Sequence, residues 1–311
     1  MKKKLKKIII CILLILIILY FFIGVFFYVY ALDPLFDGIN KKNQKNTAKE
    51  YSMEFINLFK DSGANIYDSY LNSTNNGKIS LHSYVIENES SDVWVIVTHG
   101  YLSQGAAMYD MAKEFCNRGY NILIPDLRYH GLSEGNYIGM GWHDRLDIID
   151  WINDINSKNE NCKIILYGIS MGAATTMMVT GEKLPDNVKL AISDCGYTSV
   201  WDEFEYKLNK DFKLPTFPAL YAANTICKIV AHYDFKEASC IKQVEKSNTP
   251  TLFIHGSNDT FVPFYMLDKV YEAENAEKEK LVIENARHGE SCYVDSNLYW
   301  ETIDKFIDKY I

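Results

Sequence analysis

Short apolar runs alternate with helical patterns along most of the chain. The runs at 93–100, 121–126 and 163–168 are rich in β-branched and other apolar residues, and amphipathic patterns at 108–119 and 143–156 separate them. Strands that are apolar on both faces are typical of a parallel sheet covered by helices. The alternation therefore predicts an α/β fold with a mostly parallel sheet. In such sheets, ligands bind at the carboxyl ends of the strands.

The same alternation continues to the C-terminus with one interruption. We expect further strands at 78–87 and 189–196, a strand followed by a loop within each of 250–259 and 280–289, and further helices at 51–61, 170–184, 264–274 and 296–310. Residues 197–248 contain no clear strand but many aromatic residues. A structureless loop of this length is improbable in a compact domain. The segment is therefore predicted to be a helical insertion over the carboxyl edge of the sheet.

The N-terminus carries a different signal. The run Ile8–Leu32 contains no charged residue, and it is long enough for a helix to cross a hydrocarbon core of about 30 Å. It is too long for a cleaved signal peptide and lacks a small-x-small cleavage site. Residues 1–32 are therefore predicted to be a single transmembrane anchor, residues 33–50 a polar linker and residues 51–311 the main domain. Because the anchor contributes no catalytic group, we expect the chain without residues 1–32 to be active.

Charge indicates the orientation of this anchor. Five lysines lie between Lys2 and Lys7 with no acidic residue among them, whereas the next lysines begin only at Lys41. The positive-inside rule then places the N-terminus inside the cell and the main domain outside the cell membrane. The net charge of −8 argues against a nucleic-acid partner, which would require a basic surface.

Two segments match G-x-S-x-G, and their contexts differ. Ser170 lies in Gly168–Gly172, directly between a predicted strand and a predicted helix. On such a strand-to-helix turn the serine projects from the sheet edge as a nucleophile, and the small neighbours allow the two backbones to pass closely. Ser133 lies in Gly131–Gly135, where no helix begins. Ser170 is therefore the predicted nucleophile, and Ser133 is predicted to be a loop serine.

A serine nucleophile needs a base, and the base needs an orienting acid. In this architecture the chain order is serine, acid, histidine. His288 is the only histidine after the last predicted strand. Asp259 follows the penultimate strand and is the favoured acid, with Asp194 as the alternative.

The developing oxyanion needs two backbone N–H donors. Met171 follows the nucleophile and supplies one. Tyr101 follows the strand that ends in His99-Gly100 and is the best candidate for the other. His99 and His255 each end a strand as His-Gly, and we expect structural roles for both.

The motifs HGYLSQG, DLRYHGLSEG, GISMGA, HGSNDTFVP and ARHGES stand in the order and spacing of the α/β-hydrolase superfamily. The chain most resembles bacterial membrane-anchored serine hydrolases with serine-aminopeptidase-like and monoacylglycerol-lipase-like domains. The resemblance implies an eight-stranded core with helices on both faces, a cap over the site, and hydrolysis through an acyl-enzyme. It assigns the triad to Ser170, Asp259 and His288. His143 departs from the pattern, since an acidic residue is expected there.

The predicted function is hydrolysis of carboxylic esters with short to medium acyl groups, because an aromatic insertion favours an apolar pocket. A serine peptidase is the alternative, and Glu203 or Glu205 would then bind the substrate amine, although such a pair more often lies on a solvated face. A non-catalytic binding protein is the third reading. No cofactor or metal is expected, since the seven cysteines form no C-x-x-C pair and no H-E-x-x-H motif occurs.

Overall fold

The computed structural model describes residues 2–33, 38–59, 63–75, 78–88 and 90–311. Its core is an eight-stranded sheet with the order β1-β2-β4-β3-β5-β6-β7-β8. The strands are β1 (Asn65–Asn72), β2 (Ser80–Glu87), β3 (Val93–Thr98), β4 (Asn121–Pro125), β5 (Lys163–Ile169), β6 (Val188–Asp194), β7 (Thr251–Gly256) and β8 (Lys278–Ile283). The pairings of β1 with β2 and of β2 with β4 are antiparallel, and the remaining pairings are parallel. This confirms the mostly parallel eight-stranded sheet.

Strand β1 has no counterpart among the strands expected from the sequence. It forms the edge of the sheet, and its residues alternate only between exposed and half-buried. Because an edge strand is not covered on both faces, its sequence NIYDSYLN lacks the continuous apolar run that marks the central strands. Its pairing with β2 in full register stabilises it instead.

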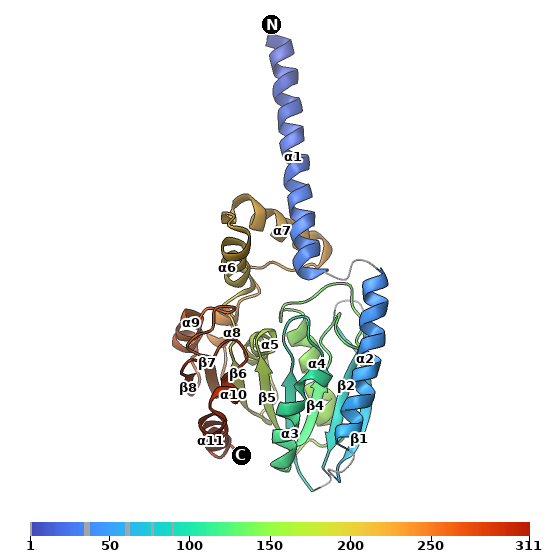
Figure 1. Cartoon of the computed structure of the whole chain (residues 1–311), viewed down its shortest axis with the longest axis vertical. Coiled ribbons are helices and arrows are strands. Elements are labelled where there is room, and N and C mark those ends of the chain that lie inside the picture. Colours follow the sequence, from blue (N-terminus) through green and yellow to red (C-terminus); the bar gives the residue numbers. More distant parts are fainter. Residues whose placement is uncertain (1, 34–37, 60–62, 76–77, 89) are drawn as a thin grey trace.

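Helices cover both faces of the sheet, and each face has its own apolar core (Figure 1). One face carries α2 (Gly38–Leu58), α3 (Tyr109–Asn117) and α11 (Ser296–Ile307), and the other carries α4 (Asp144–Lys158), α5 (Met171–Thr180) and α9 (Tyr265–Ala273). Strand β5 shows why both faces are apolar. Its Ile164 and Leu166 point into the core with Trp151 of α4, while Ile165 and Tyr167 point into the opposite core. The short helices η1 (Gly105–Met108) and α10 (Ser291–Val294) complete the domain.

The segment 197–248 contains α6 (Val200–Phe212), α7 (Thr216–Val230) and α8 (Cys240–Val244). Helices α6 and α7 lie beyond the carboxyl ends of the central strands, whereas α8 packs against α5 and α9 and returns the chain to β7 (Figure 1). Helices α6 and α7 together are called the cap below.

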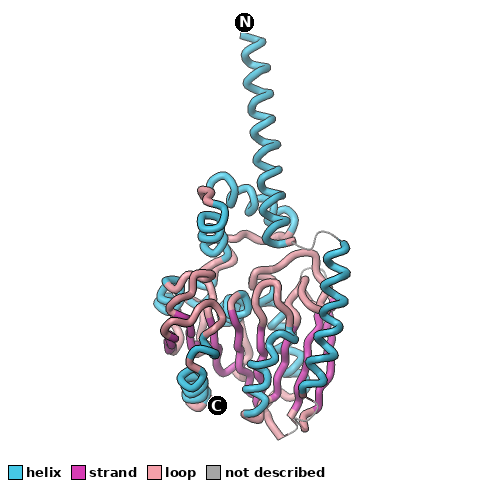
Figure 2. The backbone as a smooth tube through the Cα atoms, in the orientation of Figure 1, coloured by secondary structure: helices cyan, strands magenta, loops and turns pink. Residues whose placement is uncertain are grey.

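Helix α1 (Lys2–Leu32) projects away from the sheet, with the cap beside its second half (Figure 2). Among the described residues, it is the helix long and apolar enough to cross a membrane. Residues 2–19 are all exposed, but Gly24, Tyr28 and Leu32 are buried. A Cβ atom on Gly24 would lie 2.6 Å from the carbonyl oxygen of Ala222 in α7. Glycine at this position therefore lets the two helices pack in direct backbone contact.

The end of α1 is also bonded to the main domain. The Ile138 amide donates to the Leu32 carbonyl at 2.8 Å, and the Tyr101 hydroxyl donates to the Ala31 carbonyl at 2.9 Å. Leu32 is fully buried in the same core as α4 and α5. The last turns of α1 thus pack as part of the main domain, and a division between anchor and domain at residue 32 does not describe them.

The expected linker at 33–50 also differs from the structure. Residues 34–37 lie outside the described residues, and residues 38–50 form the first part of α2. The helix is therefore longer than the one expected at 51–61. No glycine or proline occurs between residues 39 and 58, so the polar composition of this stretch does not prevent a helix from continuing through it.

Candidate active site

Ser170 lies on the sharp turn that joins β5 to α5. Its backbone has φ 58° and ψ −118°, a conformation that non-glycine residues rarely adopt. A Cβ atom on Gly168 would lie 2.2 Å from the Gly172 carbonyl oxygen, and one on Gly172 would lie 2.1 Å from the carbonyl oxygen of Thr98 in β3. Both glycines are therefore required by close backbone contacts, and the strained turn directs Ser170 out of the sheet edge.

The second motif has a different environment. The Ser133 hydroxyl donates to the Asp126 carbonyl at 2.6 Å and accepts from the His82 amide at 2.8 Å. Ser133 is buried, and its hydrogen bond to the His82 amide connects its loop to β2. The geometry gives Ser133 a structural role.

A hydrogen-bond chain connects the three residues predicted as a triad. The Ser170 Oγ lies 2.8 Å from His288 Nε2, and His288 Nδ1 lies 2.7 Å from Asp259 Oδ2. The amides of Phe261 and Val262 donate to the other carboxylate oxygen of Asp259 at 2.8 and 3.0 Å. These amides fix the carboxylate so that Oδ2 faces the imidazole.

The charge state of Asp259 follows from these contacts. Burial alone would raise its pKa, but hydrogen bonds from His255 and His288 outweigh burial and lower the pKa to about 2. His255 Nε2 lies 3.2 Å from Asp259 Oδ2 and 3.1 Å from the Val262 carbonyl oxygen. Asp259 is therefore ionised at neutral pH, as an acid that orients a histidine must be.

Asp194, the alternative acid, has different partners. Its Oδ2 accepts from the Tyr299 hydroxyl at 2.9 Å, and burial raises its pKa to about 6. Its backbone carbonyl accepts from the Ser170 amide at 2.8 Å. Asp194 thus supports the turn that carries Ser170, while Asp259 is the carboxylate bonded to His288.

The loop after β3 approaches the predicted nucleophile closely. A Cβ atom on Gly100 would lie 3.4 Å from the Ser170 Cβ, and both Tyr101 and Met171 line the same cavity as Ser170. The two predicted oxyanion donors therefore belong to segments on either side of Ser170.

Two buried histidines hold this loop. His99 Nδ1 donates to the Gly100 carbonyl at 2.8 Å, and its Nε2 accepts from the Leu127 amide at 3.0 Å. His130 Nε2 accepts from the Leu102 amide at 3.3 Å, where the backbone has a positive φ of 53°. Burial lowers the pKa of His130 to about 3, so its imidazole is neutral and can accept. The role of His130 was not predicted, although it lies in the motif DLRYHGLSEG.

The departure from the family pattern at His143 also has a structural explanation. His143 directly precedes α4, and its Nδ1 is bonded to the Tyr137 hydroxyl at 2.7 Å. Burial, reinforced by the nearby Arg128 and Arg145, lowers its pKa to about 3. A neutral histidine therefore occupies this buried position.

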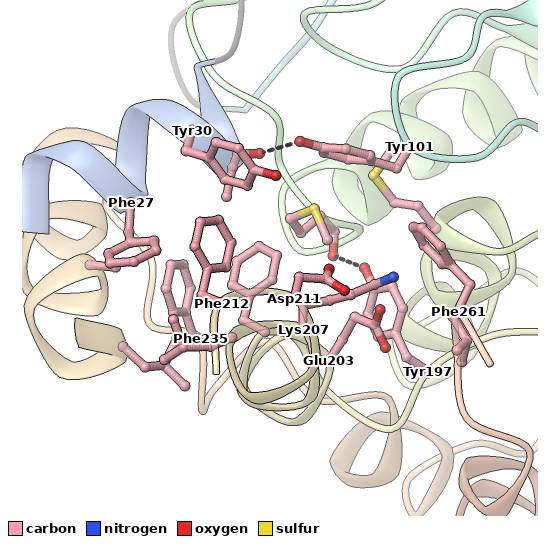
Figure 3. Close-up of a pocket in the computed structure, with 18 of the residues that line it drawn as sticks. Phe27, Tyr30, Tyr101, Tyr197, Glu203, Lys207, Asp211, Phe212, Phe235 and Phe261 are labelled. Carbon is pink, nitrogen blue, oxygen red and sulfur yellow. Dashed lines mark hydrogen bonds between the residues drawn. The ribbon is translucent and has the colours of Figure 1, made fainter. Parts of the chain in front are cut away.

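Ser170 opens into a cavity of about 540 Å³ that is mostly apolar (Figure 3). Phe27, Phe212 and Phe235 lie at one end, and Phe261 lies at the other, where its ring stacks on His288 with centroids 4.7 Å apart. Walls come from the cap and, unexpectedly, from the end of α1. The residues of α1 that line the cavity are Phe27, Val29, Tyr30 and Ala31.

Three charged residues of α6 line the middle of this cavity. Figure 3 shows Glu203, Lys207 and Asp211 between its two ends. Glu203 is only 4% exposed, and none of the described residues hydrogen-bonds either of its carboxylate oxygens. Burial raises its pKa to about 8, opposed by Lys207 and reinforced by the negative charge of Asp259. The expectation that Glu203 lies on a solvated face is therefore wrong, because the inner face of α6 is covered by the domain. Glu205 differs, since it accepts from the Thr216 hydroxyl at 2.5 Å.

One group near the triad has the composition of a metal site. Donor atoms of Cys195, Asp259 and His288 lie within 4.8 Å of one another. Burial raises the pKa of the Cys195 thiol well above its usual range, and a thiol binds metal as the thiolate. Asp259 and His288 are bonded to each other and to Ser170. Their chemistry fits proton transfer better than metal binding. All seven cysteines are free.

Comparisons with known proteins agree with this fold. A family model described as serine aminopeptidase, S33, matches residues 89–234. The protein YqkD of Bacillus subtilis is 24% identical over 84% of this chain and 88% of its own length. The thermostable monoacylglycerol lipase of Bacillus sp. strain H-257 is 22% identical over 71% of this chain and 93% of its own. The solved structure of the Pyrococcus furiosus esterase Pf2001 superimposes with a TM-score of 0.65 at 23% identity, covering 81% of this chain and 94% of that one.

Because the identities are low, these matches show that the fold is shared. The family model adds a sequence match that includes the turn with Ser170. Together they show that the chain has the α/β-hydrolase fold and is similar to esterases, lipases and peptidases with that fold.

Proposed function

We propose that the protein is a serine hydrolase that cleaves carboxylic esters with short to medium acyl groups through an acyl-enzyme. The observation that carries this proposal is the hydrogen-bond chain from Ser170 through His288 to Asp259, which ends in a mostly apolar cavity. A nucleophile, a base and an ionised orienting acid in this arrangement are the requirements of acyl transfer.

The proposed reaction follows from the positions of these atoms. His288 Nε2 takes the hydroxyl proton as Ser170 Oγ attacks the ester carbonyl, and the Asp259 carboxylate stabilises the resulting imidazolium. The amides of Tyr101 and Met171 donate to the oxyanion of the tetrahedral intermediate. The imidazolium then returns its proton to the leaving alkoxide, which leaves an acyl group on Ser170. Water, deprotonated by the same imidazole, releases the acid.

The shape of the cavity supports an acyl substrate. Its apolar end, with Phe27, Phe212 and Phe235, lies away from the Phe261 end where His288 is found. Each methylene buried there contributes about 0.8 kcal/mol. Activity should therefore rise with acyl length until the chain reaches the aromatic end, and then fall.

Glu203 supports the alternative, a peptidase that binds an amine. A buried carboxylate without a hydrogen-bond partner lacks compensation for its burial, and a substrate ammonium could supply that compensation. The same group could instead bond the hydroxyl groups of an ester's alcohol. With a pKa of about 8, Glu203 is largely protonated at neutral pH, so it can donate to a hydroxyl as well as accept from one. We therefore favour the ester.

We further propose that α1 anchors the protein in the cell membrane as a single span, with the hydrolase domain outside the cytoplasm. The exposed apolar residues of its first half and the lysines between Lys2 and Lys7 support both points.

A substrate panel tests the proposal. The full chain in detergent micelles is assayed with p-nitrophenyl esters of increasing acyl length and with aminoacyl-anilides. Ester turnover that is abolished in Ser170→Ala supports the esterase. Fast anilide turnover that is lost in Glu203→Gln but kept in Glu205→Gln would replace it with the peptidase. Turnover of neither class, or full activity of Ser170→Ala, would contradict the serine-hydrolase proposal itself.

A further inference from the structure

The outer face of α7 is apolar although none of the described residues covers it. Over its 15 residues, the helix contains a single charged residue, Lys228, whose ammonium pairs with Asp234. The neighbouring cap helix α6 has six charged residues in 13 positions. The exposed residues of α7 other than Lys228 are Phe217, Tyr221, Ile229 and Val230. A helix face exposed to water is normally rich in charge, so this face is suited to an apolar medium.

This apolar face is continuous with α1. Helix α7 packs along the second half of α1, where Gly24 contacts Ala222 (Figure 1). The residues exposed on the same turns of α1 as Gly24 are also apolar and include Phe22, Val25 and Phe26. Exposed apolar residues of the span and of the cap therefore lie on two helices that pack against each other.

The length of α1 places this contact at membrane depth. With a rise of about 1.5 Å per residue, Tyr20 and Gly24 lie about 18 and 24 Å along the helix from Ile8, the first residue after the lysines. A hydrocarbon core of about 30 Å then ends beyond both positions. The Tyr20 hydroxyl and the Thr225 hydroxyl are 3.0 Å apart and bond to each other. This pairing satisfies two polar groups that could find no water at that depth.

The same junction leads into the active-site cavity. Phe212, at the end of α6, packs edge-on against Phe27 and Tyr30 of α1, with ring centroids 5.3 Å apart in both pairs. All three line the cavity. Aromatic side chains therefore close the seam between α1 and α6 at this point, and they can change rotamer without disturbing a backbone hydrogen bond.

We propose that α7 lies in the leaflet of the bilayer nearest the hydrolase domain, and that the acyl chain of a membrane-resident ester enters the cavity through the seam between α1 and α6. The cap is then a second membrane-binding element, and the lipid acyl region is the partner of its outer face. The substrate class is an amphiphile with one ester near the membrane surface. This substrate assignment rests on the proposed ester hydrolysis, whereas the position of α7 does not.

Depth-dependent quenching tests the position of α7 without any activity. A bimane label is attached to Ile229→Cys on α7, in a Cys11→Ser, Cys116→Ser background, because the other five cysteines are buried. The control label is on Leu298→Cys, an exposed apolar position of α11, which lies far from α1 (Figure 1). In vesicles of phosphatidylethanolamine and phosphatidylglycerol, lipids with a doxyl group high on the acyl chain should quench the label at 229 strongly and the label at 298 hardly at all. Equal quenching at the two sites would overturn the proposal. That result is also expected if a second copy of the chain, rather than lipid, covers α7.

A second experiment tests the entry route. Full-length Ile229→Glu and Leu298→Glu are compared on a monoacylglycerol embedded in the same vesicles and on soluble p-nitrophenyl butyrate. A carboxylate forced against lipid should reduce turnover of the embedded ester about ten-fold in Ile229→Glu only. Turnover of the soluble ester should be unchanged in both, since neither residue lines the cavity. Equal rates on the embedded ester would refute the entry route. If the wild type cleaves neither ester, the proposed function fails, and the quenching result still decides where α7 lies.

Discussion

Removal of the first half of α1 and removal of the whole helix should have different effects on the hydrolase domain. Among the described residues, a chain that begins at residue 20 loses only exposed ones, whereas a chain that begins at residue 33 also loses Tyr28 and Leu32 from the core. The longer deletion also removes the Leu32 carbonyl, which accepts a hydrogen bond from the Ile138 amide. The structure therefore predicts that the shorter deletion is tolerated and the longer one is not, contrary to the expectation from the sequence.

The size of this effect can be worked from the contacts. Loss of a buried leucine or aromatic side chain costs about 2–5 kcal/mol, and an unsatisfied buried amide costs about 1–3 kcal/mol. Even the lower values give about 5 kcal/mol, which is a large part of the usual stability of a domain, about 5–15 kcal/mol. At about 2–4 °C per kcal/mol for a domain of this size, the melting temperature should fall by about 10–20 °C.

Thermal unfolding measures the loss of stability, and an assay with esters of increasing acyl length measures the change in selectivity. Both shortened chains are kept in the same detergent. The chain from residue 20 should match the full protein in both. The chain from residue 33 should melt at a lower temperature. It should also lose selectivity among longer acyl groups, because Phe27 and Tyr30 no longer form a wall of the cavity. Equal melting temperatures and equal length profiles for the two chains would refute the assignment of residues 20–32 to the hydrolase domain.

The remaining predictions concern single residues. Ser170→Ala and His288→Ala should each lower kcat by about 10⁴–10⁶, and the double variant should be little worse, since the triad acts as a unit; additive losses in steady-state kinetics would contradict this. Ser133→Ala should keep its activity but lose about 1–3 kcal/mol of stability in urea unfolding, because its hydroxyl makes two buried hydrogen bonds. The pKa of Glu203 is about 8 in the folded protein, so the folded state binds this proton more tightly than the unfolded state, and stability should fall as pH rises from about 4 to about 8. Glu203→Gln should therefore gain melting temperature relative to the wild type towards pH 8, and a difference that stays constant with pH would argue against the raised pKa. His130→Ala should lower kcat for esters more than it raises KM, because it positions the loop that carries Tyr101; a change in KM alone would indicate a role in substrate binding.

Local patterns in the sequence were sufficient for the sheet and for the positions of Ser170, Asp259 and His288 at its carboxyl edge. The seven strands β2 to β8 have apolar or alternating runs in the sequence. Each was expected within a few residues of its position in the structure. Ser170, Asp259 and His288 each follow a strand, so the carboxyl edge of one parallel sheet brings them together. The strain at Ser170 and the close contacts of Gly168 and Gly172 are likewise local to one strand-to-helix turn.

The features that the sequence did not predict depend on contacts between distant segments. Strand β1 is stabilised by its partner β2 rather than by an apolar pattern of its own. Glu203 is buried because the face of α6 that carries it packs towards the domain. The sequence of α6 alone does not indicate that Glu203 is buried while Lys210 is exposed.

Helix α1 is the clearest case. Its composition determined that it is a long apolar helix, and a uniformly apolar helix has no face that marks where a neighbour packs. Only the tertiary structure decided that its first half is free and that Phe27, Tyr30 and Ala31 form a wall of the cavity. The physical reason is that burial of one residue depends on which surface the fold brings against it, and that surface belongs to α7 and α6, far along the chain.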